Sequence, residues 1–259
     1  MLTIDQIRAN FPEPVFRRNP QAALVEYLQH ELLDSLFKDA AAAHLSFIGG
    51  TAIRILHGSL RFSEDLDFDN SGLSFADFEL LLGKACRDME YKGFTVEYRL
   101  VESGAYHCHI RFPELLFKTG ISPDKGRKIL VRVDAEAKER HYEPRITLLN
   151  RFGVFRRIIN APVEILLAQK MLTVLFRRRE KGRDLYDVSF LLGMTRPEDA
   201  FIQKALGVDK PEFIQMFTRR LDDLDLDFLA RDVEPFLIDP QQKDRVLYFR
   251  ETWQDILNG

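Results

Sequence analysis

Apolar residues recur along the chain with two different periods, and the change of period separates its parts. In residues 22–43 and 74–93 they recur at helical spacing, which predicts two long amphipathic helices. A short apolar run over 45–48 predicts a strand that ends at two glycines. The helical pattern that follows these glycines stops at Gly58, a residue type that commonly ends helices.

Alternation of apolar and polar side chains begins at Phe94, and a period of two residues is typical of strands. It predicts paired strands over 94–101 and 106–112 and a third strand over 128–136. After Asn150 the helical period returns and continues to the end of the chain. It predicts helices in the segments 162–179, 183–193, 197–207, 210–221, 225–237 and 240–257.

The length of 259 residues suits one large domain or two modest ones. The change of pattern near residue 150 favours two domains. We therefore expect an α+β chain, with a mixed α/β domain over residues 1–150 and a helical C-terminal domain over residues 151–259.

Composition is that of a soluble globular protein, with 46% hydrophobic and 30% charged residues. The net charge of −3 argues against a general nucleic-acid coat protein, so any basic surface must be local. Two cysteines, Cys86 and Cys108, provide neither a disulfide framework nor zinc-ligand spacing, which favours a reducing cytoplasm. No apolar run approaches the ~18 residues of a membrane span, and no signal-peptide core is found at the N-terminus, so we expect no membrane partner.

A short predicted strand over 66–68 lies in a segment with several closely spaced carboxylates. Because alternate side chains of a strand share a face, Asp65 and Asp67 project together, with Ser63 and Asp69 on the same side. Two neighbouring carboxylates repel each other, and a divalent cation removes that repulsion. Since Mg²⁺ usually takes one or two protein carboxylates together with substrate phosphates, the pattern favours a magnesium site. A solvated acidic turn is the alternative.

The glycine pair, Gly49 and Gly50, lies with Thr51 between a predicted strand and a predicted helix. Glycines there allow the backbone to approach a ligand closely, and the free N–H groups of the following helix favour phosphate. The Thr51 hydroxyl adds one further donor. Tight packing explains a glycine pair on its own. Next to a strand with two carboxylates, the pair predicts that one group holds a triphosphate and the other holds its metal.

The whole stretch from Phe47 to Asp69, FIGGTAIRILHGSLRFSEDLDFD, resembles the nucleotidyltransferases of the polymerase-β-like superfamily. It is most similar to the AbiEii/AbiGii toxin family, which includes the MenT toxins and shares the long gap between the glycines and the acids. The resemblance covers about residues 20–240. It implies a polymerase-β-like nucleotidyltransferase domain with a mixed sheet, followed by a helical C-terminal lobe.

A second group of candidate residues lies in two predicted helices of the C-terminal lobe. Lys170, Thr173 and Arg177 share one stripe of the first helix, and Asp184 and Asp187 lie one turn apart on the second. The resemblance implies that the lysine and the acids face the nucleotide site. A lysine in an apolar helix is a fixed positive charge for phosphate, unless it extends to solvent. The acids cap the helix, pair with arginine or act on the acceptor hydroxyl.

A third acid on a neighbouring strand is common in two-metal phosphoryl transfer. Asp134 is the candidate because it faces away from the apolar side of its strand, and Glu136 on the same face is the substitute. A salt bridge is the alternative for Asp134. His107 and His109 flank Cys108 on another strand, and without further soft-metal ligands nearby we expect them to be a packed or exposed pair.

Together these features predict a Mg²⁺-dependent nucleotidyltransferase that moves NMP from an NTP to an acceptor hydroxyl. The residues expected to bind nucleotide are Gly49, Gly50, Thr51, Ser63, Lys170, Arg177 and Asp187. The residues expected to act in catalysis are Asp65, Asp67, Asp134, Lys170 and Asp184, and the expected metal ligands are Asp65, Asp67 and Asp134.

By resemblance the acceptor is RNA, a tRNA 3′ end, and the enzyme is the toxin of a type IV toxin–antitoxin or phage-abortive system. A cognate antitoxin would then act without stable binding. Nine basic residues against two acids between Arg151 and Arg183 provide a local basic stripe for such an acceptor. Transfer to a small molecule such as an antibiotic, and a degenerate fold that only binds nucleotide, are the alternatives.

Overall fold

The computed structural model describes residues 1–137 and 141–258 of the chain. Its backbone contacts divide the chain into two compact units. The first comprises Met1–Ala52, Ser63–Arg140 and Pro144–Asn160, and the second comprises Ile53–Phe62, His141–Glu143 and Ala161–Gly259. Two short segments of the second unit therefore come before residue 150 in the chain.

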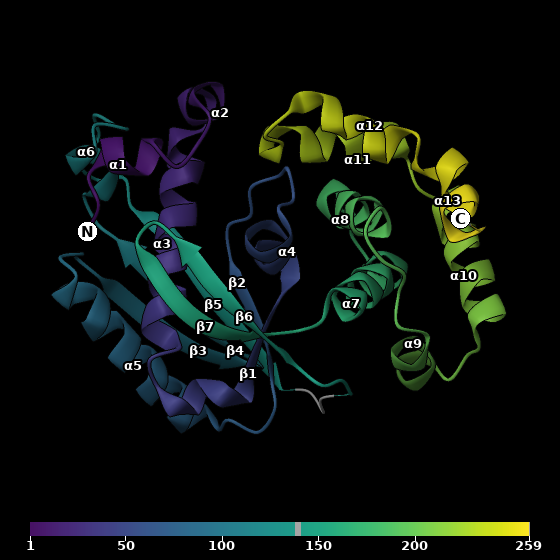
Figure 1. Cartoon of the computed structure of the whole chain (residues 1–259), viewed down its shortest axis with the longest axis horizontal. Coiled ribbons are helices and arrows are strands. Elements are labelled where there is room, and N and C mark those ends of the chain that lie inside the picture. The colour runs from purple at the N-terminus through teal and green to yellow at the C-terminus, as the bar shows by residue number, and fades with distance from the viewer. Residues whose placement is uncertain (138–140, 259) are drawn as a thin grey trace. The chain divides into compact units, whose positions relative to one another are not determined.

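The first unit contains, within the described residues, one seven-stranded sheet and the helices that accompany it (Figure 1). The strands are β1 (Leu45–Ile48), β2 (Leu66–Asn70), β3 (Glu97–Ser103), β4 (Ala105–Phe112), β5 (Ile129–Ala137), β6 (Arg145–Arg151) and β7 (Val154–Asn160). The helices are α1 (Ile4–Arg8), α2 (Glu13–Arg18), α3 (Pro20–Leu36), a 3₁₀ helix (Ala40–His44), the start of α4 (Gly49–His57), α5 (Phe75–Tyr91) and α6 (Leu115–Lys118).

The strands lie across the sheet in the order β3-β4-β5-β2-β1-β7-β6. β2 runs parallel to β5 and β1 runs parallel to β7, whereas the other neighbouring strands are antiparallel. The sheet is therefore mixed, and the predicted α+β class is confirmed. The short strands β1 and β2, which contain the ends of the glycine–acid motif, are both interior strands.

One face of the sheet packs on α3 and α5, which also pack on each other. Phe47 of β1 pairs with Phe68 of β2, and their ring centroids are 5.5 Å apart on this face. Tyr106 of β4 contacts Phe75 and Phe78 of α5. Because side chains alternate along a strand, the residues between these aromatics project from the opposite face. The acids of β2 are among them.

The strand over Val154–Asn160 corrects the prediction that the chain turns helical after Asn150. β6 and β7 form a hairpin whose turn contains two consecutive residues with positive φ, Phe152 at 56° and Gly153 at 77°. Such turns usually contain Asn-Gly or Asp-Gly, and the phenylalanine here conceals the signal. Arg156 and Arg157 also interrupt the apolar alternation that would predict a strand.

Other predicted boundaries also differ from the structure, and the helices expected over 225–237 and 240–257 are divided into shorter ones. The helix expected over 22–43 is α3, which ends at Leu36, and a separate 3₁₀ helix follows because the Asp39 carboxylate accepts a hydrogen bond from the N–H of Ala41. The strand expected from Phe94 begins only at Glu97. Phe94 is buried and packs against Tyr27 of α3, so it belongs to the connection and not to the ladder.

The second unit is helical in its described part. Its elements are the end of α4, then α7 (Val163–Phe176), α8 (Gly182–Leu192), α9 (Asp199–Leu206), α10 (Lys210–Asp222), α11 (Leu226–Val233), two 3₁₀ helices (Glu234–Phe236 and Pro240–Lys243), α12 (Asp244–Leu247) and α13 (Phe249–Asn258). Trp253 of α13 is buried, and its ring centroid is 4.7 Å from that of Phe217 in α10. Its N–H donates to Thr218 Oγ1 at 3.1 Å, so this tryptophan anchors the last helix.

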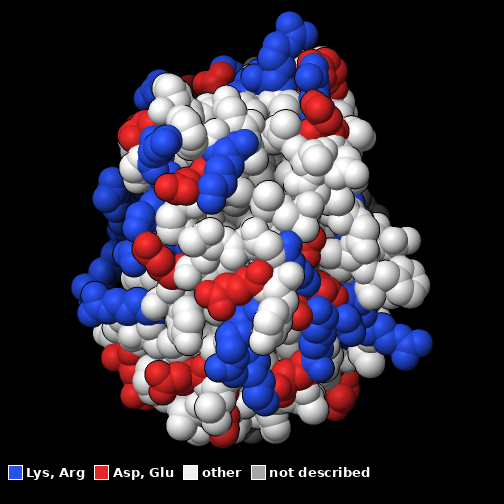
Figure 2. Space-filling view, turned by 90° about the vertical axis from the view of Figure 1, so that its left-hand side faces the viewer, with Lys and Arg blue, Asp and Glu red and all other residues white. Residues whose placement is uncertain are grey.

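Basic and acidic side chains are mixed over the face shown in Figure 2, with lysine and arginine gathered along one edge and in the lower part of the view. This mixture fits the small net charge of −3. Both cysteines are buried and free. Among the described residues, no helix has the length and apolar character that a membrane crossing requires.

Candidate active site

Two carboxylates lie side by side on interior strands of the sheet. Asp67 of β2 is paired with Asp134 of β5 in the parallel register. Paired residues on neighbouring strands project from the same face, and the strands are about 4.8 Å apart. This face is opposite to the one on which Phe68 packs. Asp134, expected on a neighbouring strand, thus lies beside Asp67, whereas Asp65 comes one residue before β2 begins.

The glycine bend lies directly against Asp67. Ile48, the last residue of β1, pairs with Asp67, and Gly49 follows it with a φ of +76°. A Cβ atom at Gly49 would lie 2.3 Å from Asp67 Oδ2, far inside van der Waals contact. Glycine is therefore needed at this position both for the left-handed dihedral and for the close approach of the carboxylate.

Helix α4 begins at Gly49 itself and not after the glycine pair, as the pattern predicted. The first N–H groups of a helix have no partner inside it, so α4 presents donors beside Asp67. Thr51 is buried, and its Oγ1 donates a short hydrogen bond to the carbonyl oxygen of Asp65. The hydroxyl expected to contact phosphate therefore has a partner within the protein, which ties Asp65 to the first turn of α4. Gly50 is also buried.

Ser63 lies two residues before Asp65 in the connection to β2 and is half-buried. Its carbonyl oxygen accepts a hydrogen bond from Gln29 Nε2 of α3 at 2.9 Å. This bond fixes the backbone of the connection from the direction of the buried helix. The backbone of Ser63 therefore has a fixed position two residues before Asp65.

Asp65 forms a bidentate ion pair with Arg132 of β5, which the sequence did not indicate. Arg132 Nε donates to Asp65 Oδ1 at 3.0 Å, and Nη2 donates to Oδ2 over a shorter distance. The hydrogen bond with Asp65 is the main cause that raises the pKa of Arg132 above its ordinary value. The arginine side chain is 44% exposed and that of the aspartate 17%. The Arg132 guanidinium therefore neutralises the Asp65 carboxylate.

Asp134 has a partner of its own on β4. His107 is the residue paired with Asp134 in the antiparallel register, and His107 Nδ1 and Asp134 Oδ1 share a hydrogen bond at 2.8 Å. The expectation that the two histidines form a packed or exposed pair missed this contact. The substitute acid, Glu136, lies two residues further along β5, where it pairs with Asp69 of β2.

The donor chemistry of Asp67 and Asp134 fits Mg²⁺, because two carboxylates on adjacent strands leave the remaining positions to water and phosphate oxygens. Among the described residues, no three His, Cys, Asp or Glu side chains are placed so that together they could hold a metal ion. The pairing of Asp65 with Arg132 agrees with this. For Asp65 to join a metal site, it would have to leave the arginine.

A buried group of charged side chains holds the helices of the second unit together. Arg61 donates two hydrogen bonds of 2.6 Å to the two carboxylate oxygens of Asp187. Lys170 Nζ of α7 lies 2.9 Å from Asp187 Oδ2 and 3.1 Å from Asp184 Oδ1, both in α8. Arg177 Nη1 lies 2.8 Å from Asp184 Oδ2. Three cations thus meet two acids in this cluster, which we call the ion cluster.

Burial and pairing act in opposite directions on the ion cluster. Burial alone lowers the pKa of Lys170, but Asp187 and Asp184 outweigh it, so that the pKa is raised above its ordinary value. Burial likewise raises the pKa of Asp187, but Arg61 and Lys170 outweigh it and lower the pKa below its ordinary value. Lys170 and Asp187 therefore stay charged at neutral pH.

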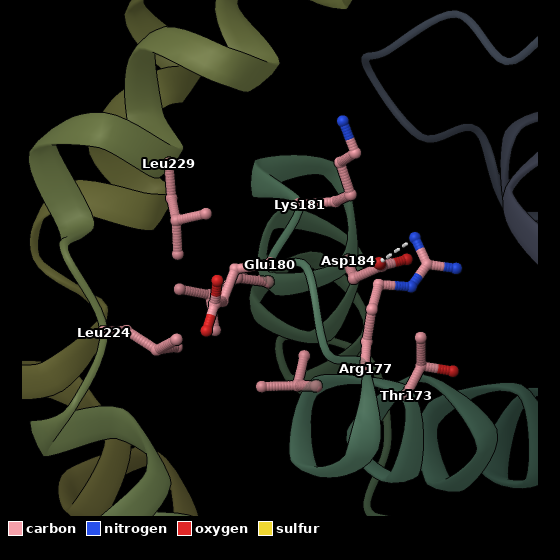
Figure 3. Close-up of a pocket in the computed structure, with 9 residues that line it drawn as sticks. Thr173, Arg177, Glu180, Lys181, Asp184, Leu224 and Leu229 are labelled. Atoms are coloured by element: carbon pink, nitrogen blue, oxygen red, sulfur yellow. Dashed lines mark ion pairs between the residues drawn. The ribbon is translucent and has the colours of Figure 1, made fainter.

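The small pocket in Figure 3 adjoins the ion cluster within the second unit. Arg177 reaches Asp184 there, whereas Lys181 points away from that carboxylate (Figure 3). Thr173 Oγ1 donates to the carbonyl oxygen of Gln169 at 2.8 Å. Arg177 caps the end of α7 with extended dihedrals, so it does not continue the helical stripe expected for Lys170 and Thr173. Apolar side chains of Val174, Leu185, Leu224 and Leu229 complete the lining.

The predicted site residues thus form two groups, one in each unit. The first unit contains Gly49, Gly50, Thr51, Ser63, Asp65, Asp67 and Asp134, of which Gly49 and Asp134 lie beside Asp67 and Thr51 is bonded to Asp65. The second unit brings Lys170, Arg177, Asp184 and Asp187 together. Sequence reasoning missed Arg61, Arg132 and His107. The alternation in β4 and β5 indicated the faces of the last two, but their partners depend on the register.

Comparisons with known proteins identify the family and the fold. The family model described as nucleotidyl transferase AbiEii toxin, type IV TA system, matches residues 31–258. JHP933 from Helicobacter pylori has a similar fold, with a TM-score of 0.54, 20% identity and 91% of each chain covered. MenT4, a nucleotidyltransferase toxin from Mycobacterium tuberculosis H37Rv, has a TM-score of 0.56 and 17% identity over 97% of this chain and 99% of its own. No curated protein matches the chain.

The matched residues include the glycine bend, the acids of β2 and β5, and the ion cluster. The resemblance inferred from the glycine–acid motif is thereby confirmed. The chain is a nucleotidyltransferase and belongs to the AbiEii toxin family of type IV toxin–antitoxin systems.

Proposed function

We propose that the enzyme transfers NMP from an NTP to the hydroxyl of an RNA acceptor, a tRNA 3′ end, in a Mg²⁺-dependent reaction. The single observation that supports this best is the register of Asp67 and Asp134 beside the Gly49 bend. It joins two oxygen ligands for a metal to a backbone bend that suits phosphate. The same residue types at greater separation would support only a structural role.

The glycine bend is the proposed triphosphate site. The first N–H groups of α4 have no partner within the helix and are the proposed donors to the phosphate oxygens, beside the Asp67 carboxylate that packs against Gly49. Ser63 adds a hydroxyl next to the acidic segment. Thr51 acts mainly through its bond to the Asp65 carbonyl, which holds the bend and the acidic segment in register.

Asp67 and Asp134 are the proposed ligands of Mg²⁺, and Asp65 joins them when it leaves Arg132. When bound, the metal neutralises phosphate charge and polarises the α-phosphate. Asp134 also draws the proton from the attacking hydroxyl. His107 holds the Oδ1 atom of Asp134 and thereby orients its carboxylate.

The proposed chemical step is an in-line displacement. The acceptor oxygen forms a bond to the α-phosphorus, the bond from that phosphorus to the bridging oxygen of pyrophosphate breaks, and pyrophosphate leaves. The proton of the hydroxyl goes to the Asp134 carboxylate. Charge spread over the phosphate oxygens makes fixed positive groups the main source of catalysis for such reactions.

For the second unit we propose that Lys170 and Arg177 provide positive charge for the nucleotide phosphates. The ion cluster contains one more cation than acid, so its positive charge is not fully neutralised within the cluster. Asp184 and Asp187 hold these cations in place, because each lies within ion-pair distance of Lys170. Asp184 is also the proposed assistant in catalysis.

As a toxin of this family, the enzyme would act in the cytoplasm, in a type IV toxin–antitoxin or phage-abortive system. Its antitoxin would counter it without forming a stable complex. The chemistry itself does not depend on these biological roles, so the acceptor is the part to test first.

The test is incubation of the purified protein with each labelled NTP and Mg²⁺, first with total tRNA and then with small hydroxyl acceptors. We expect label on tRNA with wild type and none with Asp67→Asn, which keeps the size of the side chain. Label on a small acceptor alone would replace RNA as the substrate. A folded wild type that labels nothing and binds no NTP would refute the proposal.

A further inference from the structure

The sheet face from which Asp67 and Asp134 project also contains a row of basic side chains that the proposed chemistry does not use. Arg99 of β3 is paired with His109 of β4, and His109 is paired with Arg132 of β5. Residues paired in this way project from one face, about 4.8 Å apart from strand to strand. We call Arg99, His109 and Arg132, together with Arg111 two residues beyond His109, the basic row.

The basic row runs next to the acids of the site. Asp134 is two residues beyond Arg132 on β5, and two residues span about 6.6 Å along a strand. His107, which contacts Asp134, is likewise two residues from His109. At one end the row meets Asp65 through Arg132, and at the other it reaches β3, the edge strand of the sheet.

The outer members of the row have unneutralised charge. Among the residues that the structure describes, the side chains of Arg99 and Arg111 have no hydrogen bond or ion pair. Glu97, the acid directly opposite Arg111, is instead bonded to Lys128 at 2.7 and 3.1 Å. Arg99 is exposed and Arg111 is half-buried, so both guanidinium groups are available to an anion.

The opposite face of the same strands holds the row in place. Cys108 and Ile110, which alternate with the histidines and Arg111 on β4, are fully buried. Tyr98, next to Arg99 on β3, directs its hydroxyl towards Gly83 of α5. The strands beneath the basic row are therefore packed on their opposite face, which sets the positions from which the cations project.

The order of the strands separates the basic row from the triphosphate site. Gly49 follows β1, which lies on one side of β2, whereas the row begins at β5 on the other side. An in-line displacement requires the attacking hydroxyl and the leaving pyrophosphate on opposite sides of the α-phosphorus. A row that starts at β5 thus lies across Asp67 from the Gly49 bend, on the side from which we expect an in-line acceptor to arrive.

We propose that the basic row binds the sugar–phosphate backbone of the RNA acceptor and leads its terminal hydroxyl to Asp67 and Asp134. This inference rests on the proposed function and adds the surface on which the acceptor lies. Charge complementarity selects a polyanion as the occupant, and the length of the row, about 10 Å over three strands, exceeds what one phosphate needs. Backbone contacts of this kind do not depend on the base sequence.

The experiment measures binding of fluorescent tRNA to the full chain over a series of salt concentrations. The variants are Arg99→Gln, Arg111→Gln and the double substitution. The control is Arg87→Gln, since Arg87 is an exposed arginine of α5, the helix packed on the opposite face. Titration with NTP and Mg²⁺, and the thermal midpoint, are measured for each protein.

We expect each substitution in the row to reduce the slope of log K against log salt by about 0.7, the value for one phosphate contact of a single strand. The double variant should bind tRNA at least tenfold more weakly at about 0.15 M salt, with NTP binding and thermal midpoint unchanged. The control should behave as wild type.

Unchanged tRNA affinity in the double variant would overturn the inference, and so would an equal loss in the control. A loss of NTP affinity with tRNA affinity retained would assign the row to the triphosphate, which also overturns it. Failure of the proposed function is a different result. In that case the wild type transfers no NMP to tRNA, whereas failure of this inference leaves transfer intact in the double variant.

Discussion

Substitution of Gly49 by alanine tests the contact between the glycine bend and the acid pair. The position has a φ of +76°, and its hydrogen faces the Asp67 carboxylate. A side chain here has two separate effects. It strains the backbone, because L-residues in the left-handed region lose about 1–2 kcal/mol. It also occupies the space in which Asp67 Oδ2 lies.

The size of the second effect follows from the distances. The added Cβ would lie 2.3 Å from Asp67 Oδ2, and ordinary contact begins at 3.4 Å, so the carboxylate must move by about the difference, 1 Å. A misplacement of ~1 Å at a reacting centre lowers the rate roughly 100-fold. We therefore expect kcat of Gly49→Ala to fall about 100-fold, with a loss of unfolding free energy near the ~1–2 kcal/mol of backbone strain alone.

Gly58→Ala is the matched control. Gly58 follows the end of the same helix with a φ of +72°, but a Cβ there meets nothing within 4 Å. Both variants have the backbone strain, and only Gly49→Ala displaces Asp67. Initial rates of labelled NMP transfer and urea unfolding curves are compared for the two proteins. Equal rates in both variants would refute the reasoning, because the contact with Asp67 would then have no effect on the reaction.

Three further predictions concern the groups around the two sites. Asp187→Asn removes the carboxylate paired with the buried Arg61 and leaves Lys170 with Asp184 alone, so urea titration should show a loss of about 3–5 kcal/mol, and a loss below about 1 kcal/mol would contradict the role of the ion cluster. Burial raises the pKa of Asp187, but Arg61 and Lys170 lower it below its ordinary value of 3.8, so its stabilisation is present above that value and is lost as the pH falls through the lowered pKa. Unfolding midpoints measured down to about pH 2 should therefore fall less steeply in Asp187→Asn than in wild type, and parallel curves would speak against the assignment. His107→Ala should lower kcat by roughly 10-fold or more with NTP affinity unchanged in calorimetry, because Asp134 loses the partner that orients it, and an unaltered kcat would show that this orientation is not needed.

The acidic strand with Asp65 and Asp67 was predictable because its chemistry is local in the sequence. Asp65 and Asp67 alternate with apolar residues, and the glycine pair precedes them by one short helix. Asp134 followed from the alternation within its own strand. The alternation of apolar and polar residues does not indicate which strands lie next to each other in the sheet. The parallel pairing of β2 with β5 places Asp134 beside Asp67, and it depends on tertiary structure alone.

The partners of the predicted residues were not predictable for the same reason. Arg132 meets Asp65 and His107 meets Asp134 only because of the register of β4, β5 and β2. Arg61 and Asp187 are 126 residues apart in the chain, and their pairing depends on the packing of the second unit. An arginine among serines and acids is ordinary in a sequence, so no local signal marks Arg61 as buried.

The missed strand β7 illustrates a different limit. Its hairpin turn uses Phe152 and Gly153 at positive φ, a pair that no turn preference indicates. Phe152 is nevertheless buried and packs on Tyr27 and His30 of α3. Tertiary packing thus stabilises a backbone conformation that the local sequence disfavours. The strand can therefore be recognised only when the packing of Phe152 on α3 is known.

The central claim is that Asp67 and Asp134 hold the metal of a triphosphate bound beside Gly49. The most direct measurement is a calorimetric titration of a non-hydrolysable NTP into wild type and into the Asp67→Asn, Asp134→Asn double variant, each with and without Mg²⁺. Wild type should bind the nucleotide far more tightly with Mg²⁺, and the folded double variant should lose that gain. An equal gain from Mg²⁺ in both proteins would contradict the claim.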